Sequence, residues 1–122
     1  MMVGPKSILI ADDDRFVREF LRIILTKAGY KLFFAEDGLT AVEMAATLRP
    51  DLVLTDGLLP KLHGFEVCKS IKTFKEPPKV VILSGVYTKP TYRCEAAREF
   101  LADALLCKPI DSVELLACIE LQ

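Results

Sequence analysis

Five polar residues of the sequence stand at the ends of short apolar runs: Asp12, Asp13, Asp56, Ser84 and Lys108. Carboxylates that are brought together repel one another, which raises their proton affinity unless a cation lies between them. Oxygen ligands with few nitrogen or sulfur donors nearby favour Mg²⁺. A carboxylate, a divalent cation, a lysine and a hydroxyl donor can together stabilise a transferring phosphoryl group, because its transition state carries charge on peripheral oxygens. We therefore predict phosphoryl chemistry if the fold brings these residues together.

The stretch 52–56 is central to this prediction. Its mostly aliphatic residues are bounded by Pro50 and Gly57, a pattern typical of a short strand that is buried on both faces. Asp56 is the last residue of the run, and open α/β sheets bind ligands at the carboxyl ends of their parallel strands. Taken alone, the same residues could equally form a turn that Asp56 opens and Gly57 continues. The polar residues at the other strand ends favour the functional interpretation.

Alternating apolar runs and helical patterns predict how these residues are positioned. Strands are predicted at residues 7–11, 30–35, 52–56, 80–83 and 104–107, and each precedes a segment with helical periodicity. The predicted inward faces of the five helices are Val17, Phe20, Leu21, Ile24, Leu25 and Ala28; Ala41, Val42, Ala45 and Leu48; Phe65, Val67, Cys68, Ile71 and Phe74; Ala96, Ala97, Phe100 and Leu101; and Val113, Leu115, Leu116 and Ile119. Gly29 and Pro50 should end the first two helices, and Asp37 and Asp111 should cap the second and fifth. Five such units predict an α/β fold with a doubly wound parallel sheet, whose strand ends meet at one edge.

Composition limits the classes of protein that remain. The 122 residues are enough for one domain with a single core, and we expect residues 1–122 to form it. The formal net charge is -1 and the basic residues are spread along the chain, which argues against direct nucleic-acid binding. The four cysteines have no C-x-x-C spacing, and the longest apolar runs are too short to span a membrane. These features predict a soluble cytoplasmic protein without a zinc site or a disulfide framework.

The ordered set of strand-end residues resembles the receiver domain of two-component response regulators, from about Lys6 to Leu121. The similarity rests on the acidic cluster 12–14, on Asp56 with Pro60 and Gly64 at the family's spacing, on Ser84, and on the pair Lys108-Pro109. The resemblance implies a flavodoxin-like (βα)5 three-layer sandwich with parallel strand order 2-1-3-4-5. It also implies phosphorelay signalling by a domain that catalyses only its own phosphorylation and dephosphorylation, and not an enzyme with a separate substrate.

Position by position, the family's phosphoryl-transfer residues match Asp56, Lys108 and Ser84. By this resemblance, Asp56 accepts the phosphoryl group of a phosphohistidine, Lys108 pairs with that group, and Ser84 supplies a hydroxyl that moves to meet it. The implied partners are a histidine kinase or phosphotransfer protein, and an output domain or downstream protein. The output partner would contact the fourth helix, the fifth strand and the fifth helix, and the same resemblance leaves room for a phosphorylation-dependent dimer.

The resemblance also implies the ligands of a Mg²⁺ cofactor. Asp13 matches a direct ligand, and Asp12 matches a ligand that acts mainly through water. Asp56 and the backbone carbonyl of Leu58 complete the protein's share. Asp14 matches a variable position and is expected to be a surface or capping residue.

Two positions depart from the family pattern and affect the switch and the loop before the third helix. Family members commonly have a tyrosine or phenylalanine three residues before the lysine, where this chain has Leu105. The usual hydroxyl-to-aromatic switch therefore cannot operate in its standard form, and we expect signalling through Ser84 and the loop 86–90. His63 occupies a position that is often acidic, and we expect it to be an exposed loop residue. The segment between Ser84 and Lys108 is also a little longer than usual.

Two further expectations concern the chain around the site. Leu58 and Val86 match positions that border the path of the attacking water, and neither side chain can hydrogen-bond a water or accept its proton. We therefore predict slow hydrolysis of phosphorylated Asp56. A cis peptide is predicted at Lys108-Pro109, because the lysine must turn from a strand end into the site as the chain enters a helix.

Three other classes of protein fit parts of the pattern. The main alternative is a receiver fold that docks partners without being phosphorylated, although the retained strand-end residues argue against it. A Mg²⁺-dependent phosphatase with an Asp-x-Asp motif matches residues 12–14 superficially, but that class usually needs a cap for which 122 residues leave no room. A flavin-binding domain would need a phosphate loop after the first strand, where this chain has three carboxylates that would repel a phosphate.

Overall fold

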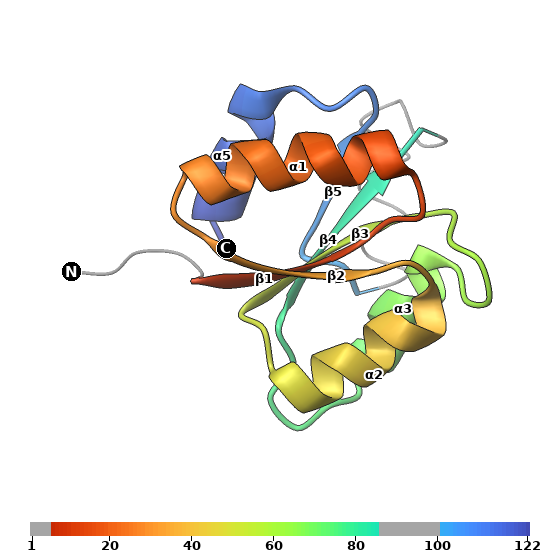
Figure 1. Ribbon diagram of the computed structural model, residues 1–122. Helices are drawn as coiled ribbons and strands as arrows, with labels where there is room; N and C mark the ends of the chain where they lie inside the picture. Colours follow the sequence, from red (N-terminus) through yellow and green to blue (C-terminus); the bar gives the residue numbers. More distant parts are fainter. Residues whose placement is uncertain (1–5, 86–100) are drawn as a thin grey trace.

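The computed structural model describes residues 6–85 and 101–122 of the chain. Its five parallel strands form one sheet in the order β2-β1-β3-β4-β5. The strands are β1 (Ser7–Ala11), β2 (Lys31–Ala35), β3 (Leu52–Asp56), β4 (Lys79–Ser84) and β5 (Ala104–Cys107), and the described helices are α1 (Arg15–Lys27), α2 (Gly38–Leu48), α3 (Gly64–Ile71) and α5 (Ser112–Glu120). Figure 1 shows α1 and α5 over one face of the sheet and α2 and α3 over the other. The predicted doubly wound α/β fold with strand order 2-1-3-4-5 is confirmed.

Both faces of the sheet are covered by apolar side chains. Leu9 and Val53 pack on the side of α2 and α3, and Ile8 and Leu54 pack on the side of α1 and α5. All five residues of β3 are buried, which explains why the strand reads as a continuous apolar run and not as an alternating one. Polar side chains of the central strands can therefore reach solvent or a ligand only at the edges of the sheet.

The helix ends follow the predicted capping signals. Asp14 caps α1 by accepting the backbone N–H of Phe16 at 2.9 Å, and Asp37 caps α2 by accepting that of Thr40 at 2.8 Å. Asp111 accepts the N–H of Glu114 at 3.1 Å at the start of α5. These bonds satisfy N–H groups that have no partner within the helix. The capping role of Asp14 agrees with its predicted role outside the metal site.

Among the described residues, five side chains that were predicted to face the core are exposed instead. One is Ala28, at the C-cap of α1, and the other four are larger. They are Phe20 (39%), Leu48 (40%), Leu101 (60%) and Val113 (74%). Phe20 lies about 100° around α1 from the fully buried Leu21, so it falls outside the strip that touches the sheet. Val113 lies on the far side of α5 from the buried Leu115, so it also falls outside the strip that touches the sheet. Leu101 has a φ of 64°, which no helix contains, and Leu48 is the last residue of α2.

Some predictions fall on parts of the chain that are not described. The first residues of the predicted fourth helix, the loop 86–90 and Cys94 lie outside the described residues. Within the ranges 6–85 and 101–122, no helix combines the length and the apolar character needed to cross a membrane.

Candidate functional site

The predicted site residues meet at the carboxyl edge of the sheet. Asp12 follows β1, Asp56 ends β3, and Lys108 follows β5. The ammonium Nζ of Lys108 lies 3.1 Å from Oδ1 of Asp56 and 3.5 Å from Oδ2 of Asp12. The fold thus brings together residues from three strands that are up to 96 positions apart in the sequence, counting from 12 to 108.

Three carboxylates form a cluster in which a metal ion could be held. Ligand oxygens of Asp12, Asp13 and Asp56 all lie within 4.8 Å of one another. Asp12 is only 1% exposed, and its Oδ1 accepts the backbone N–H of Asp14 at 2.8 Å. Its Oδ2 is buried without a hydrogen-bond partner in the described part of the protein. A buried oxygen of this kind is normally bonded, so the donor set fits a hard divalent cation such as Mg²⁺.

Burial and neighbouring charges shift the pKa values of Asp12 and Lys108. Burial raises the pKa of Asp12, and the nearby Asp56 adds to this effect, while the Asp14 N–H and Lys108 act in the opposite direction. Burial also disfavours the ammonium form of Lys108, but the carboxylates of Asp12 and Asp56 outweigh it and raise the pKa of Lys108. Lys108 therefore stays positively charged, while the single ammonium balances only part of the negative charge of the carboxylates.

Two glycines allow the chain to fold tightly behind Asp56. The N–H of Gly57 donates to the carbonyl of Leu83 at 2.9 Å, and the N–H of Gly64 donates to the carbonyl of Gly57 at 3.1 Å. A Cβ at Gly64 would lie 1.9 Å from the backbone oxygen of Asp56, which no side chain could tolerate. The start of α3 therefore packs directly on the backbone of the strand end and fixes the position of Asp56.

Ser84 and Lys108 are held on neighbouring strands. Ser84 ends β4, is 2% exposed, and pairs in register with Cys107 of β5. The N–H of Lys108 donates to the carbonyl of Ser84 at 3.0 Å. The Lys108-Pro109 peptide is cis, as predicted from the sequence. Both residues thus reach the edge at which Asp56 lies.

The remaining predicted positions surround this cluster. The side chain of Leu58 is 59% exposed at the edge of the site, whereas Leu105 is 8% exposed and packs in the core with Val80 and Ile82. His63 precedes α3 as an exposed residue whose side chain makes no capping bond, as expected. Leu105 is thus an aliphatic residue of the core. Val86 lies outside the described residues.

Sequence reasoning missed Arg18 as a part of the site. Its Nη1 donates to the backbone carbonyl of Asp12 at 3.3 Å and lies 3.2 Å from Oε1 of Glu36. Arg18 therefore ties the turn after β1 to the end of β2. The available signal was its place on α1, one helical turn beyond Asp14, but nothing in its neighbours marked it as different from the other arginines of that helix.

The chain is similar to proteins of one family. A sequence model of the response regulator receiver domain matches residues 8–120. The response regulator MprA of Mycobacterium sp. (strain KMS) is 37% identical over 113 residues, which are 93% of this chain and 48% of that protein. This chain thus spans about half the length of that relative.

Solved structures give the same result. The receiver domain of the Francisella response regulator 1452 has a TM-score of 0.87 and 25% identity, over 95% of this chain and 94% of that one. The signal receiver domain of a signal transduction histidine kinase from Syntrophus aciditrophicus has a TM-score of 0.82 and 29% identity, over 95% and 86%. The strand order and the strand-end residues described above thus occur in a chain that resembles receiver domains in both sequence and structure.

Proposed function

The chain belongs to the response regulator receiver domain family, and on that premise we propose that Asp56 is its phosphoacceptor. The observation that carries this proposal is the position of Asp56, which is 8% exposed at the end of β3 with Oδ1 3.1 Å from Nζ of Lys108. We propose further that residues 1–122 act as one receiver domain, because the described strands all belong to a single sheet.

In the proposed reaction, a carboxylate oxygen of Asp56 attacks the phosphorus of a phosphohistidine on a donor protein. The oxygen–phosphorus bond forms as the nitrogen–phosphorus bond breaks, and the imidazole leaves with the electron pair and takes up a proton. Lys108 binds one phosphoryl oxygen as a charged donor, and the Ser84 hydroxyl donates to another. The raised pKa of Lys108 supports the first of these roles.

The proposed cofactor is Mg²⁺, with Asp12, Asp13, Asp56 and the backbone carbonyl of Leu58 as its protein ligands. Oδ2 of Asp12 supports this assignment, because it is buried and has no partner by hydrogen-bond geometry other than its ion pair with Lys108 at 3.5 Å. When bound, Mg²⁺ would offset the repulsion among the carboxylates and the charge of the phosphoryl oxygens. The bond from the Asp14 N–H to Oδ1 of Asp12 holds that side chain in place.

An apolar groove beside the site supports a protein donor. The groove has a volume of about 280 Å³ and is lined by Phe16, Val17, Phe20, Lys108, Pro109 and Ile110. Phe16 is 86% exposed, which is costly for a phenylalanine unless another surface covers it. Because Lys108 belongs to both the groove and the site, an apolar surface docked here would present its phosphohistidine to Asp56. We propose that a histidine kinase or phosphotransfer protein is the occupant.

On the output side, we propose that β5, α5 and the predicted fourth helix carry the signal to an output domain, a downstream protein or a second copy of the chain. The 74% exposure of Val113 on α5 supports an apolar contact there.

The proposed compartment is the cytoplasm, which would keep the buried Cys68 and the Cys118 thiols reduced.

The proposed function can be tested with acetyl phosphate as a small donor. With Mg²⁺ present, intact-mass spectrometry should detect one phosphoryl adduct on the native protein and none on Asp56→Asn. Asp111→Asn is the matched control, because it makes the same chemical change at a helix cap, where asparagine also caps well. If the native protein forms no adduct under conditions in which it is folded, the chain is instead a receiver fold that binds partners without phosphorylation.

A further inference from the structure

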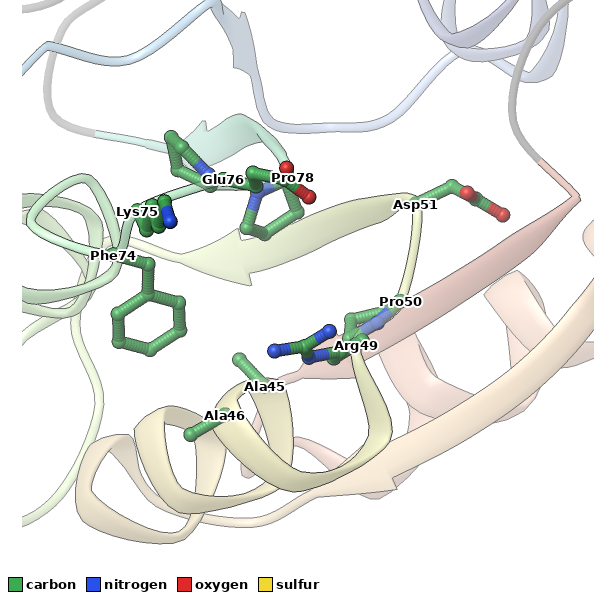
Figure 2. Close-up of a pocket in the computed structure, with 10 residues that line it drawn as sticks. Ala45, Ala46, Arg49, Pro50, Asp51, Phe74, Lys75, Glu76 and Pro78 are labelled. Atoms are coloured by element: carbon green, nitrogen blue, oxygen red, sulfur yellow. The ribbon is translucent and has the colours of Figure 1, made fainter.

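A second pocket lies at the opposite edge of the sheet from Asp56. It has a volume of about 680 Å³ and is formed between the end of α2 and the segment from the turn after α3 to the start of β4 (Figure 2). Ala45, Pro50, Phe74 and Pro78 supply its apolar surface. The volume falls within the range of about 300–1,000 Å³ that is common for small-molecule sites. The length of β3 separates this pocket from the proposed phosphorylation site.

Arg49 is the charged group that gives this pocket a preference for a carboxylate ligand. It ends α2 in a left-handed conformation, with φ of 50°, and its backbone N–H donates to the carbonyl of Ala45 at 3.1 Å. Figure 2 shows its side chain extending along the pocket toward the side that Phe74 forms. Within residues 6–85 and 101–122, no carboxylate or carbonyl pairs with its guanidinium. An unpaired planar guanidinium beside an apolar wall is suited to bind a carboxylate in a bidentate manner.

The acidic residues around the pocket do not neutralise Arg49. Oδ2 of Asp51 already accepts the N–H groups of Lys6 and Ser7, at 3.1 and 2.9 Å, and the hydroxyl of Ser7 at 3.0 Å. Glu76 and Lys75 both line the pocket and carry opposite charges, so together they add no net charge to its lining. The charge left for a ligand to balance is therefore the positive charge of Arg49.

We propose that this pocket binds a small aromatic carboxylate, with the carboxylate on Arg49 and the ring against Phe74 and the proline rings. A planar apolar ring matches the aromatic face of Phe74, and such stacking adds to the energy of burial. A ligand of this size should bind with a dissociation constant on the order of 1 mM. The site goes beyond the proposed function, because it needs neither Asp56 nor a phosphoryl donor.

Binding can be tested on the full, unphosphorylated chain by following backbone amide signals in NMR titrations with 2-naphthoate. We expect saturable shifts that cluster at the residues of the pocket. Two matched probes separate the contributions: 2-naphthamide keeps the ring without the charge, and acetate keeps the carboxylate without the ring. Both should bind at least about tenfold more weakly than 2-naphthoate, since each lacks one of the two contacts.

Variants of the protein locate the interaction. Arg49→Asn should weaken 2-naphthoate binding by about tenfold or more, and asparagine suits the left-handed conformation, so the fold should persist. Phe74→Leu should weaken binding while keeping an apolar side chain. Lys27→Gln removes a cation at the end of α1, on the other face of the sheet, and should change nothing. Unsaturable shifts, equal affinity for 2-naphthamide or acetate, or unchanged affinity in Arg49→Asn would overturn the proposal. None of these results would affect the phosphoacceptor role of Asp56, because no phosphoryl donor is present.

Discussion

Carboxylates at the two edges of the sheet have opposite surroundings. At the amino edge, Oδ2 of Asp51 accepts three hydrogen bonds from Lys6 and Ser7. Burial by itself would raise the pKa of Asp51, but these bonds outweigh it and lower that pKa. At the carboxyl edge, Oδ2 of Asp12 is buried without a hydrogen bond, and burial raises the pKa of Asp12.

Asp103, which precedes β5 at the amino edge, resembles Asp51 because one of its oxygens also accepts more than one hydrogen bond. Its Oδ2 accepts the backbone N–H of Val80 at 2.7 Å and Nζ of Lys72 at 2.6 Å, and Lys72 also donates to the carbonyl of Pro78 at 2.9 Å. Asp51 and Asp103 at the amino edge thus each have one oxygen that accepts several hydrogen bonds. At the carboxyl edge, Oδ2 of Asp12 has only the Lys108 ammonium nearby, at 3.5 Å, and we expect a bound cation to supply the missing contact.

The largest expected effect on stability lies at the amino edge. Asp103→Ala should lower the free energy of unfolding by about 2–3 kcal/mol, because it leaves the Val80 N–H and the Lys72 ammonium without their partner. Urea denaturation monitored by circular dichroism measures this change. A midpoint equal to that of the native protein would mean that the network contributes nothing to stability.

Asp12→Asn provides the matched comparison at the carboxyl edge. In Mg²⁺-free buffer this substitution should leave the free energy of unfolding unchanged or slightly higher. It removes a buried negative charge that neighbouring groups balance only in part. A loss as large as that of Asp103→Ala would show that Asp12 is bonded for stability after all, and the contrast between the two edges would be wrong.

Mg²⁺ binding gives the next largest effect. Asp13→Asn should weaken Mg²⁺ binding by about tenfold or more, because it removes a charged oxygen ligand from the cluster. Isothermal titration calorimetry measures the affinity, and the rise in melting temperature on adding Mg²⁺ gives an independent readout. Asp14→Asn is the control, because Asp14 caps α1 and asparagine also caps well. Equal Mg²⁺ affinity in Asp13→Asn and the native protein would remove Asp13 from the site.

The meeting of the site residues could be predicted from the sequence, whereas the contrast between the two edges could not, for physical reasons. A parallel sheet forces every strand to point the same way, so residues at the ends of apolar runs, such as Asp56 and Lys108, must meet. The partners of Asp103 could not be predicted, because Lys72 is 31 residues away and reaches it only through the packing of loops. The missing hydrogen bond at Oδ2 of Asp12 could not be predicted either, since sequence patterns do not report which buried group lacks a hydrogen-bond donor.

Helix faces were predicted less well than strand ends. The apolar stripe of α1 includes Phe20 next to Leu21, yet of these two only Leu21 is buried in the core. Extra apolar residues beside a core stripe look the same in a sequence whether they pack inside the domain or serve a docking surface. The groove next to Lys108 was therefore missed, although Phe16 and Phe20 are plain in the sequence.

The lifetime of the phosphorylated state should depend on the side chains at the carboxyl edge. Replacing Leu58 with Asn and Val86 with Glu should speed loss of the phosphoryl group by about tenfold, since the new side chains can position and deprotonate the attacking water. Leu58 is 59% exposed, so the change at that position disturbs no core packing. Decay is followed by intact mass after removal of acetyl phosphate, with Leu58→Asn alone as an intermediate. Equal decay rates in all three proteins would exclude control by these side chains.

The smallest expected effect is the pH dependence of stability at the amino edge. Because folding lowers the pKa of Asp51 below its ordinary value of 3.8, the ionised side chain stabilises the fold above that pH. This contribution is lost as the pH falls through the lower pKa of the folded state. The difference in melting temperature between the native protein and Asp51→Asn should therefore shrink below about pH 3.8. A difference that stays constant from pH 6 to pH 2 would contradict the bonded state of Asp51.

We propose that the two ends of β3 differ in chemistry: Asp56 accepts the phosphoryl group, and Asp51 only stabilises the fold. Borohydride reduces an aspartyl phosphate to homoserine, so it marks the modified residue permanently. After treatment with acetyl phosphate and Mg²⁺, fragmentation of the tryptic peptide 32–61, which stays intact at Arg49-Pro50, should locate homoserine at position 56 and leave Asp51 intact. Homoserine at position 51, or at any site other than 56, would contradict the account.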